Sequence, residues 1–284
     1  MNFRLPEILW RIMRLAFTKM NGAGNDFVLA DNRKHKFTLS RDQVVRLCDR
    51  HRGVGADGVI LLTRCESGKA DWAWQFYNSD GSMGEMCGNG ARCFGKFVQR
   101  HTHTHGDFTF ETEAGIITAQ FEGERVTVSL TPPNNLRLNE RLTLSVGPQN
   151  LHFINTGVPH VVLFVLDADK AMVKALGPEI RRHAHFAPKG TNVNFVQVLG
   201  PNRIRVRTFE RGVEGETLAC GTGVTASALI SSRVYNFTSP VTVQVQGGDL
   251  LEVRFQQEGG VFSDVRLTGP ADFVYEGEME LPDQ

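Results

Sequence analysis

Residues 87–91 read CGNGA and residues 220–224 read CGTGV, so one Cys-Gly-x-Gly pattern occurs twice, 133 residues apart. The same offset places Gly24 on Gly157, each in a short polar loop between two apolar runs. The separation of 63 residues between glycine and cysteine is therefore identical in both copies. Self-similarity at a fixed offset indicates an internal repeat, and we predict two homologous domains that arose by duplication.

Short alternating apolar runs surround these two stretches and predict strands. In the first half the runs cover residues 15–20, 27–31, 74–77, 108–112, 116–121 and 125–130. In the second half they cover residues 161–165, 194–198, 203–208, 241–245, 250–255 and 261–267. Helices are expected after the capping box that begins at Ser40, and over residues 88–100, 168–176 and 223–231. Many strands with few helices predict a mixed, α+β fold, with a linker near residues 132–135.

The 284 residues are enough for two domains, and their charge is balanced, with 31 Lys and Arg against 31 Asp and Glu. This balance leaves no electrostatic footprint for a nucleic acid or a membrane surface, and no apolar run is long enough to span a bilayer. The five cysteines are odd in number and widely spaced, so we expect reduced thiols in the cytoplasm. Residues 1–13 do not resemble a signal peptide. The leading expectation is a soluble enzyme that acts on a small molecule.

The repeated stretch places one cysteine at the start of each of two predicted helices. Cys87 and Cys220 would lie beside backbone N–H groups that have no partner within the helix. Such a position favours a thiolate, with a pKa below the usual value of about 8.5, and the same N–H groups can bind a carboxylate. Two thiols on opposite sides of a ligand can remove a proton from one face of a carbon and return one to the other. This arrangement fits inversion at the α-carbon of an amino acid.

The remaining candidates favour structural roles. A lone cysteine is most often a small buried hydrophobe, and we interpret Cys48, Cys65 and Cys93 in this way. The cysteine spacing is unlike that of a zinc site, so no metal is expected. Residues 101–105, HTHTH, are expected to form a polar loop. Residues 22–26 lack the third glycine and the lysine of nucleotide-binding loops, so no phosphate site is predicted.

Four motifs together resemble the diaminopimelate epimerase family: KMNGAGNDF at 19–27, YNSDGS at 77–82, MCGNGARC at 86–93, and ERG at 210–212 with ETLACGTG at 216–223. The resemblance implies two similar domains, each a β-barrel-like sheet around a central helix, with the active site in the cleft between them. The boundaries it implies are an extension at 1–13, an N-terminal domain at 14–131 to which a C-terminal strand at 268–284 returns, and a C-terminal domain at 132–267.

The family interconverts LL- and meso-diaminopimelate in lysine biosynthesis without pyridoxal phosphate or a metal, so the resemblance implies an isomerase that needs no cofactor. It implies that Cys87 and Cys220 serve as thiolate base and thiol acid, and that His160 and Glu210 tune the two thiols. The residues implied to bind the substrate are Asn25, Asn78, Gly88, Asn89, Asn192, Glu210, Arg211, Gly221 and Thr222. The family forms homodimers, and Tyr275 matches a position associated with that contact.

Two positions depart from the family pattern and keep alternatives open. Gly58 stands where one branch has a Gln that contacts the ligand, and Val158 replaces an Asn in a Gly-Asn-Pro-His motif. A related epimerase for another amino acid, such as proline or hydroxyproline, is therefore an alternative. From another class, a thiol redox protein could close the two cysteines into a disulfide, and a Cys hydrolase would pair one cysteine with His160. A redox protein would work without any amino-acid ligand.

Overall fold

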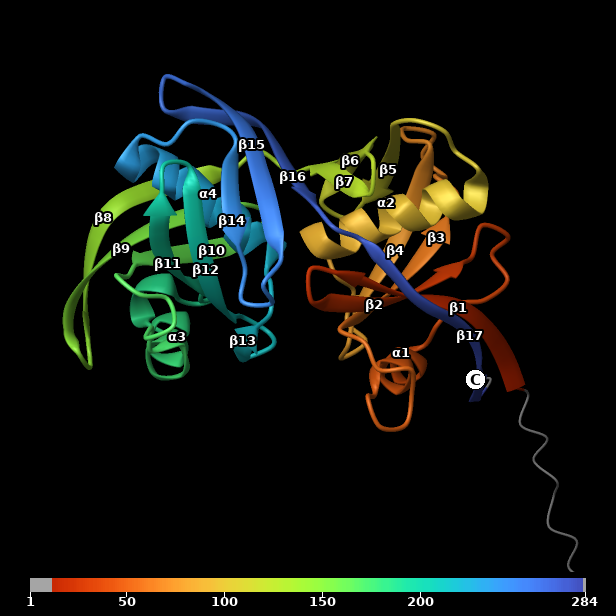
Figure 1. Ribbon diagram of the computed structural model, residues 1–284. Coiled ribbons are helices and arrows are strands. Elements are labelled where there is room, and N and C mark those ends of the chain that lie inside the picture. The colour runs from red at the N-terminus through yellow and green to blue at the C-terminus, as the bar shows by residue number, and fades with distance from the viewer. Residues whose placement is uncertain (1–11, 283–284) are drawn as a thin grey trace, which may run out of the picture.

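The computed structural model describes residues 12–282 and consists of two halves that lie side by side (Figure 1). The first half contains β1 (Ile12–Gly22), β2 (Asn25–Asp31), α1 (Arg41–Cys48), β3 (Gly58–Thr63), β4 (Trp72–Asn78), α2 (Gly88–Thr102), β5 (Phe108–Thr112), β6 (Gly115–Glu122) and β7 (Arg125–Ser129). The second half contains β8 (Asn134–Leu144), β9 (Gly147–Asn155), β10 (Pro159–Phe164), α3 (Val173–Arg181), the short 3-10 helix η1 (Ala184–Phe186), β11 (Asn192–Gly200), β12 (Arg203–Glu210), β13 (Gly215–Thr217), α4 (Gly221–Tyr235), β14 (Val241–Gln244), β15 (Leu250–Glu258) and β16 (Val261–Gly269). The last strand, β17 (Asp272–Pro282), lies against β1 in the first half.

The two halves have the same strand topology. In the first half β1–β2 is antiparallel, β2–β3 parallel, β3–β4 antiparallel, β4–β5 parallel, and β5–β6–β7 antiparallel. In the second half β9–β10 is antiparallel, β10–β11 parallel, β11–β12 antiparallel, β12–β14 parallel, and β14–β15–β16 antiparallel. The order of pairings is identical, which confirms the predicted mixed fold with two similar halves.

Strand β17 completes the first half although it comes last in the chain. It pairs antiparallel with β1, from Asn21↔Asp272 to Ile12↔Pro282, in the place that β8 takes beside β9. The halves are joined by the antiparallel pair of β7 and β16. Residues 1–11 of the expected extension lie outside the described residues, and Ile12 and Met13 already belong to β1.

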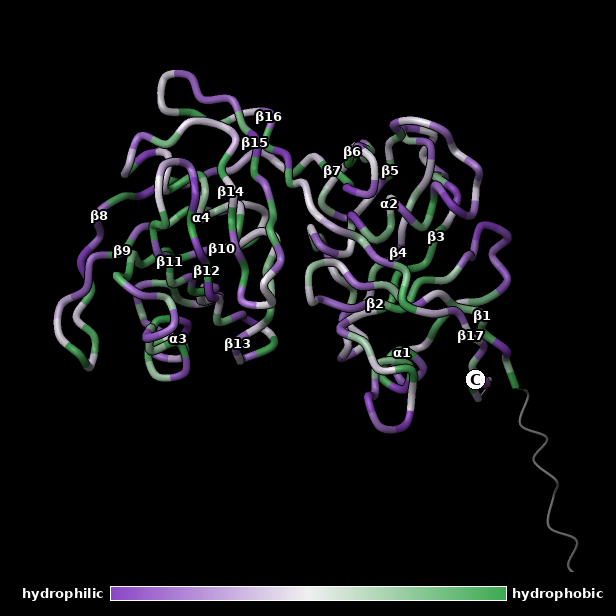
Figure 2. The backbone as a smooth tube through the Cα atoms, viewed as in Figure 1, coloured by the Kyte–Doolittle hydropathy of each residue, from purple (hydrophilic) through white to green (hydrophobic). Residues whose placement is uncertain are grey.

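Each half encloses one buried helix. On α2 the side chains of Phe94, Phe97 and Val98 are fully buried, and on α4 every residue from Gly221 to Ser232 is buried. The hydroxyls of Ser227 and Ser231 are satisfied within α4, because each donates to the carbonyl one turn earlier at 2.7 Å. The apolar stretches follow the strands of both halves (Figure 2). No helix in the described part of the chain is both long and apolar enough to cross a membrane.

Several elements differ from the sequence prediction. Strand β3 was not predicted, because its six residues are all buried and its apolar run shows no alternation. Strands β8 and β9 form a long hairpin that begins at Asn134, where we expected the linker. The helix expected over residues 168–176 is instead α3, which continues through Pro178 although proline favours a helix end. Packing sustains α3, since Gly177 lies directly on the ring of Phe209.

Candidate active site

The N-termini of α2 and α4 meet at the junction of the two halves, and each follows one of the repeated cysteines. Cys87 is the N-cap of α2 and Cys220 the N-cap of α4, both with extended backbone (φ −142°, ψ 115° and φ −127°, ψ 108°). A Cβ atom added to Gly221 would lie 3.2 Å from Gly88 Cα and 3.1 Å from Leu267 of β16. Glycine at both positions therefore permits the close approach of the two helix ends.

The sulfur of Cys87 contacts groups from both α2 and β2. It accepts a hydrogen bond from the Gly90 N–H at 3.5 Å, and its S–H donates to Asn25 Oδ1 at 3.6 Å. Asn89 Nδ2 donates to Asn25 Oδ1 and to the Ala219 carbonyl, both at 3.4 Å. Because Ala219 belongs to the loop before α4, Asn89 connects the two cysteine-bearing loops.

Asp57 fixes the orientation of the Asn25 amide and was not among the predicted site residues. Asn25 Nδ2 donates to Asp57 at 2.5 Å, so its Oδ1 faces the thiol of α2. Arg50 bridges Asp57 and Asp26 at 2.8 and 2.7 Å, and buried Lys19 pairs with Asp26 at 2.6 Å. Burial raises the pKa of Asp26, but the hydrogen bonds from Arg50 and Lys19 outweigh it and bring the pKa to about 2. Asp57 could have been predicted from the sequence as a charged residue in the loop directly before an apolar run.

Cys220 is buried and is linked to His160 through Thr222. The Thr222 hydroxyl lies 3.5 Å from Cys220 Sγ and 2.9 Å from His160 Nε2. Thr208 donates to Asn194 Oδ1 at 2.9 Å, so Asn194 Nδ2 donates to His160 Nδ1 at 3.2 Å. His160 therefore carries its proton on Nε2 and donates it to Thr222, whose hydroxyl is free to donate to the Cys220 sulfur.

His160 is neutral at physiological pH. Burial, assisted by the positive charge of Arg211, lowers its pKa to about 3. Any influence of His160 on the thiol passes through Thr222 rather than through direct contact. Asn194 and Thr208 were not predicted as site residues, because each lies inside a run that was predicted only as a strand. A buried polar side chain in such a run is the signal that could have found them.

Glu210 lies at the end of β12 and acts on both thiols. Its carboxylate accepts a hydrogen bond from the Thr217 hydroxyl at 2.9 Å. Burial raises the pKa of Glu210 to about 7; the Thr217 hydrogen bond opposes this shift and the charge of Asp57 adds to it. The negative charge of Glu210 in turn raises the pKa of Cys87 and of Cys220.

The prediction that the helix ends lower the thiol pKa values is wrong as a net effect. Burial raises the pKa of Cys87 to about 11, although the N–H groups of Gly90 and Asn89 oppose it. Burial also raises the pKa of Cys220, against the hydrogen bonds from Thr222 and the Gly223 N–H. Removing a thiolate from water outweighs two or three N–H or O–H donors. A thiolate at this junction therefore needs positive charge nearby.

Asn192 and Arg211 are joined to each other on the β11 and β12 side of the junction. Asn192 is buried, donates to the Pro159 carbonyl at 3.0 Å and accepts from the Arg211 N–H at 2.8 Å. Burial and the charge of Arg181 lower the pKa of the Arg211 guanidinium. Asn78 is exposed at the end of β4 and donates to Ser82 at 3.0 Å. Within residues 12–282, no hydrogen bond joins the side chains of Asn78 or Arg211 to either cysteine.

The two departures from the family pattern have different surroundings. A Cβ atom at Gly58 would lie 2.7 Å from the Tyr77 carbonyl oxygen and 2.8 Å from the Phe76 ring, so a glutamine does not fit on this backbone. Val158 is partly exposed, and its carbonyl accepts a hydrogen bond from the Thr156 N–H at 3.2 Å.

Tyr275 lies on β17, opposite Lys19 of β1, and is 46% exposed. Its ring meets Phe17 edge-on at 6.0 Å, and its hydroxyl donates to the Val54 carbonyl at 3.4 Å.

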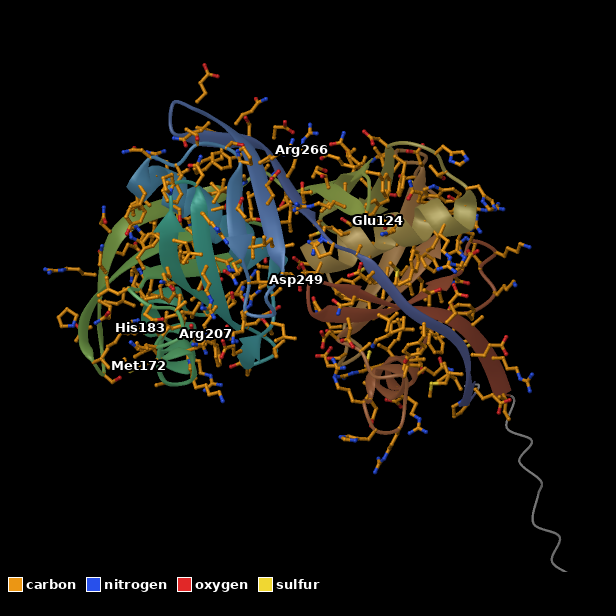
Figure 3. All side chains as sticks on the ribbon, in the orientation of Figure 1. Glu124, Met172, His183, Arg207, Asp249 and Arg266 are labelled. Atoms are coloured by element: carbon orange, nitrogen blue, oxygen red, sulfur yellow. The ribbon has the colours of Figure 1, made fainter. Side chains whose placement is uncertain are left out.

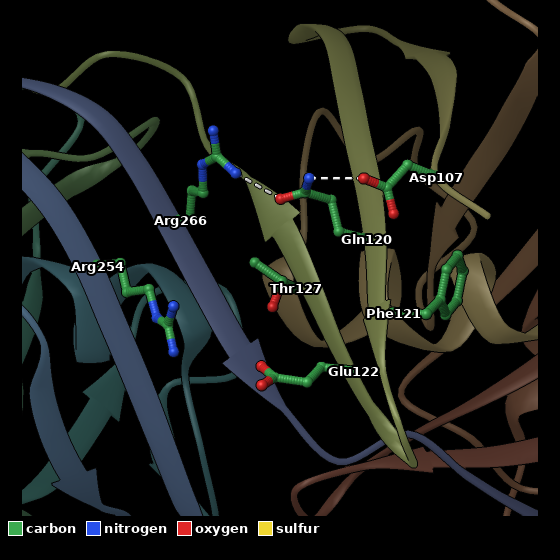
Figure 4. A pocket seen from close by; sticks show the side chains of 7 residues that line it. All are labelled: Asp107, Gln120, Phe121, Glu122, Thr127, Arg254 and Arg266. Carbon is green, nitrogen blue, oxygen red and sulfur yellow. Dashed lines mark hydrogen bonds between the residues drawn. The ribbon is translucent and has the colours of Figure 1, made fainter.

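A cavity of about 290 Å³ lies between β6–β7 and β15–β16 (Figure 4). Its lining residues are Asp107, Gln120, Phe121, Glu122, Thr127, Arg254 and Arg266, none of them a predicted site residue. Both arginines are engaged, since Arg266 pairs with Asp264 at 2.8 Å and Arg254 with Glu252 at 2.7 Å. The candidate active site is therefore the junction of the two helix N-termini.

The fold is shared with a solved structure, the hydroxyproline epimerase from Agrobacterium vitis, with a TM-score of 0.72 and 18% sequence identity over 95% of this chain and 93% of that one. This likeness shows the class of fold: two similar halves, each built around one helix.

The model of the diaminopimelate epimerase family matches residues 17–136 and 152–274, one segment in each half. The diaminopimelate epimerase of Aquifex aeolicus is 44% identical over 278 residues, covering 93% of this chain and 98% of the relative. That of Hydrogenobaculum sp. is 42% identical over 277 residues, with the same coverage. The chain belongs to the diaminopimelate epimerase family.

Proposed function

We propose that this protein interconverts LL- and meso-2,6-diaminopimelate, as a step of lysine biosynthesis, by proton transfer between two cysteines and the substrate α-carbon. The observation that carries the proposal is the meeting of two helix N-termini capped by Cys87 and Cys220. Membership of the family supports the choice of substrate.

The helix ends supply the groups that bind the reacting carboxylate. The first N–H groups of α2 and α4, from Gly88, Asn89, Gly221 and Thr222, have no acceptors within their helices. They converge because Gly88 and Gly221 are in contact. A carboxylate placed there receives hydrogen bonds and the favourable field of two helix dipoles.

The proton transfer balances between the two sulfurs. One cysteine, as a thiolate, takes the α-proton as the C–H bond breaks, and the electron pair delocalises into the carboxylate. The other cysteine gives its S–H proton to the opposite face of the carbon and is left as the thiolate. The next turnover in reverse starts from that thiolate, so Cys87 and Cys220 exchange roles with the direction of reaction.

Acid and base alone contribute on the order of 10²- to 10⁴-fold, which is too little for so weak a carbon acid. The N–H groups at the carboxylate stabilise the negative charge as it develops. Burial of Cys220 and the contact between the helix ends keep water from the carbanion. The α-ammonium group of the substrate adds positive charge, which favours a thiolate whose pKa burial has raised.

We assign the distal end of the substrate to Arg211 and Asn192 of the second half, together with Asn78 of the first half. Arg211 offers a planar fork of donors suited to a carboxylate, and Asn192 holds the backbone that carries it. The amide of Asn78 suits the distal carboxylate, and the carboxylate of Glu210 suits the distal ammonium group. These groups favour a substrate with two amino-acid ends over proline.

Incubation with LL-diaminopimelate in deuterated water tests the proposal. We expect formation of the meso epimer with deuterium at the α-carbon, read by chiral chromatography and NMR, in protein freed of metal and pyridoxal phosphate. Cys87→Ala and Cys220→Ala should each lose at least about 100-fold in rate. Cys65→Ala is the control, since this thiol lies with Ser67 and Glu111 away from the junction.

Full activity in either cysteine variant would overturn the two-base assignment. Epimerisation of proline or hydroxyproline but not of diaminopimelate would select the alternative substrate.

We also propose a homodimer that uses the outer face of β17. Exposed Val274 and Tyr275 lie side by side in sequence on that strand. A molar mass of two chains in light scattering supports the dimer, and a mass of one chain overturns it.

The five cysteines are all free thiols in the structure, which supports a reducing compartment, the cytoplasm.

A further inference from the structure

Arg92 of α2 is a fully buried arginine next to the candidate site. Its exposed fraction is 0%. Nη1 donates to the Gly88 carbonyl at 3.2 Å, Nη2 to Asn89 Oδ1 at 3.0 Å, and Nε to the Pro270 carbonyl at 3.2 Å. All three acceptors are neutral.

A buried arginine without a counter-charge is unusual, because charged side chains are almost never fully buried unless paired. Within residues 12–282, no carboxylate lies within ion-pair distance of Arg92. The charged or titratable groups that act on it are Cys87 and Cys93 from α2, Asp249 from the turn before β15, and Arg125 from β7. Asp249 lies between the two halves (Figure 3). Desolvation lowers the pKa of Arg92 to about 10, so the guanidinium remains charged at neutral pH.

The contacts of Arg92 reach three separate segments. Through Asn89, whose Nδ2 donates to the Ala219 carbonyl, Arg92 is connected to the loop before α4. Through Pro270 it holds the crossing from β16 to β17. A Cβ atom on Gly269 would lie 3.0 Å from Arg92 Nε, so the backbone packs directly on the guanidinium. The charge is therefore fixed in place from several sides.

We propose that Arg92 is a positioning residue that orients Gly88 and Asn89 and holds, beneath the site, the positive charge that balances the Cys87 thiolate and the substrate carboxylate. This inference rests on the proposed function. Arg92 touches neither the sulfur nor the substrate and acts through α2. This role explains why no carboxylate pairs with Arg92, because the Cys87 thiolate and the substrate carboxylate supply the negative charge during catalysis. The charge of Arg92 also lowers the pKa of Cys87, against the effect of burial.

Arg92→Met and Arg92→Lys test the proposal in the full chain, with Lys96→Met as the matched control. Lys96 lies one turn further along α2 and pairs with Glu124. Glu124 is labelled in Figure 3. The first readout is the rate of iodoacetamide alkylation of Cys87 against pH without substrate, with Cys65 as the internal reference. The second is kcat and KM for epimerisation.

In Arg92→Met we expect the pH of half-maximal Cys87 alkylation to rise by about 1, a tenfold loss of thiolate at a given pH, and kcat to fall at least about tenfold. Arg92→Lys should restore the alkylation profile and only part of kcat, because lysine keeps the charge without the fork. Lys96→Met should match the wild type in both.

An alkylation profile in Arg92→Met that matches the wild type would overturn the electrostatic role, and an unchanged kcat would overturn the positioning role. If Arg92→Met does not fold, the test uses Arg92→Lys. Because this variant keeps the charge, a shift of its Cys87 alkylation profile from that of the wild type would contradict the inference. Failure of the proposed function is distinguishable, because the wild-type chain would then show no epimerisation while the alkylation result stands.

Discussion

Thr222 serves the site in two ways. Its N–H is one of the free donors at the start of α4, and its hydroxyl lies between His160 and Cys220. Because Asn194 fixes the His160 proton on Nε2, the hydroxyl is oriented toward the sulfur. A chain of hydrogen bonds thus runs from the interior of the second half to one thiol, with no charged group along it.

Thr222→Val should separate these two roles. Valine keeps the shape and the N–H but removes the hydroxyl that donates to Cys220. Loss of one buried hydrogen bond of about 1 to 2 kcal/mol predicts a fall in kcat of about 5- to 30-fold with KM changed less. Initial rates in both directions of the reaction measure this. The control is Ser231→Ala, which removes a buried hydroxyl further along α4. An equal kcat for wild type and Thr222→Val would show that the Thr222 hydroxyl has no part in the reaction.

At the scale of the element, the two helix starts depend on their glycines. Gly221→Ala would place a methyl group 3.2 Å from Gly88 Cα and 3.3 Å from Asn89 Oδ1. We expect the helix ends to separate by a few tenths of an ångström and kcat/KM to fall at least about tenfold, since carboxylate binding and the carbanion both depend on the converging N–H groups. Steady-state kinetics measure it.

Gly200→Ala is the matched substitution for this test. No heavy atom lies within 4 Å of a Cβ at Gly200, so its activity should equal that of the wild type. A Gly221→Ala enzyme with wild-type kinetics would show that the close approach of the helices is unnecessary.

Local patterns were enough to predict the cysteine N-caps, because Cys-Gly-x-Gly before an apolar helix is a short-range signal. The internal repeat was also predicted from the sequence, because both Cys-Gly-x-Gly stretches and both glycine loops share one offset. Asp57 and Asn194 could not be found in this way, because their partners are distant in the sequence. Asp57 meets Asn25, and Asn194 meets His160 through the pairing of β10 with β11. The raised thiol pKa values depend on burial by elements far apart in sequence, which no local pattern reports.

At the scale of the whole molecule, the chain crosses between the halves twice, once after β7 and once after β16. Both crossings lie at the β7–β16 pair, where Gly269 faces Val126 and the Leu130 N–H donates to the Val265 carbonyl at 2.9 Å. We expect any rotation of one half against the other to pivot about this pair of strands. Arg92, through Pro270, lies at the same place.

Glu210 should make the stability of the whole chain depend on pH. Its folded pKa of about 7 is above the ordinary 4.5, so the folded state holds the proton more tightly than the unfolded state. This contribution to stability is fully present below pH 4.5 and is lost as pH rises through about 7. In Glu210→Gln the fall in unfolding free energy over this range should be smaller by up to about 3 kcal/mol.

Urea unfolding at several pH values and one protein concentration measures this difference. Glu124→Gln is the control, because Glu124 is exposed at 92% and its folded pKa is lowered rather than raised. The same pH slope in wild type and Glu210→Gln would contradict the raised pKa.

The return of β17 to β1 has a consequence for synthesis of the protein on the ribosome. Synthesis of β1 ends at Gly22, but its partner spans Asp272–Pro282. At about 5 to 20 residues per second, roughly 250 residues pass before that partner emerges, on the order of 10 to 50 s. Throughout that interval the first half carries an open strand edge, which is a template for wrong pairing between nascent chains. The second half has no such delay, since β8 immediately precedes β9.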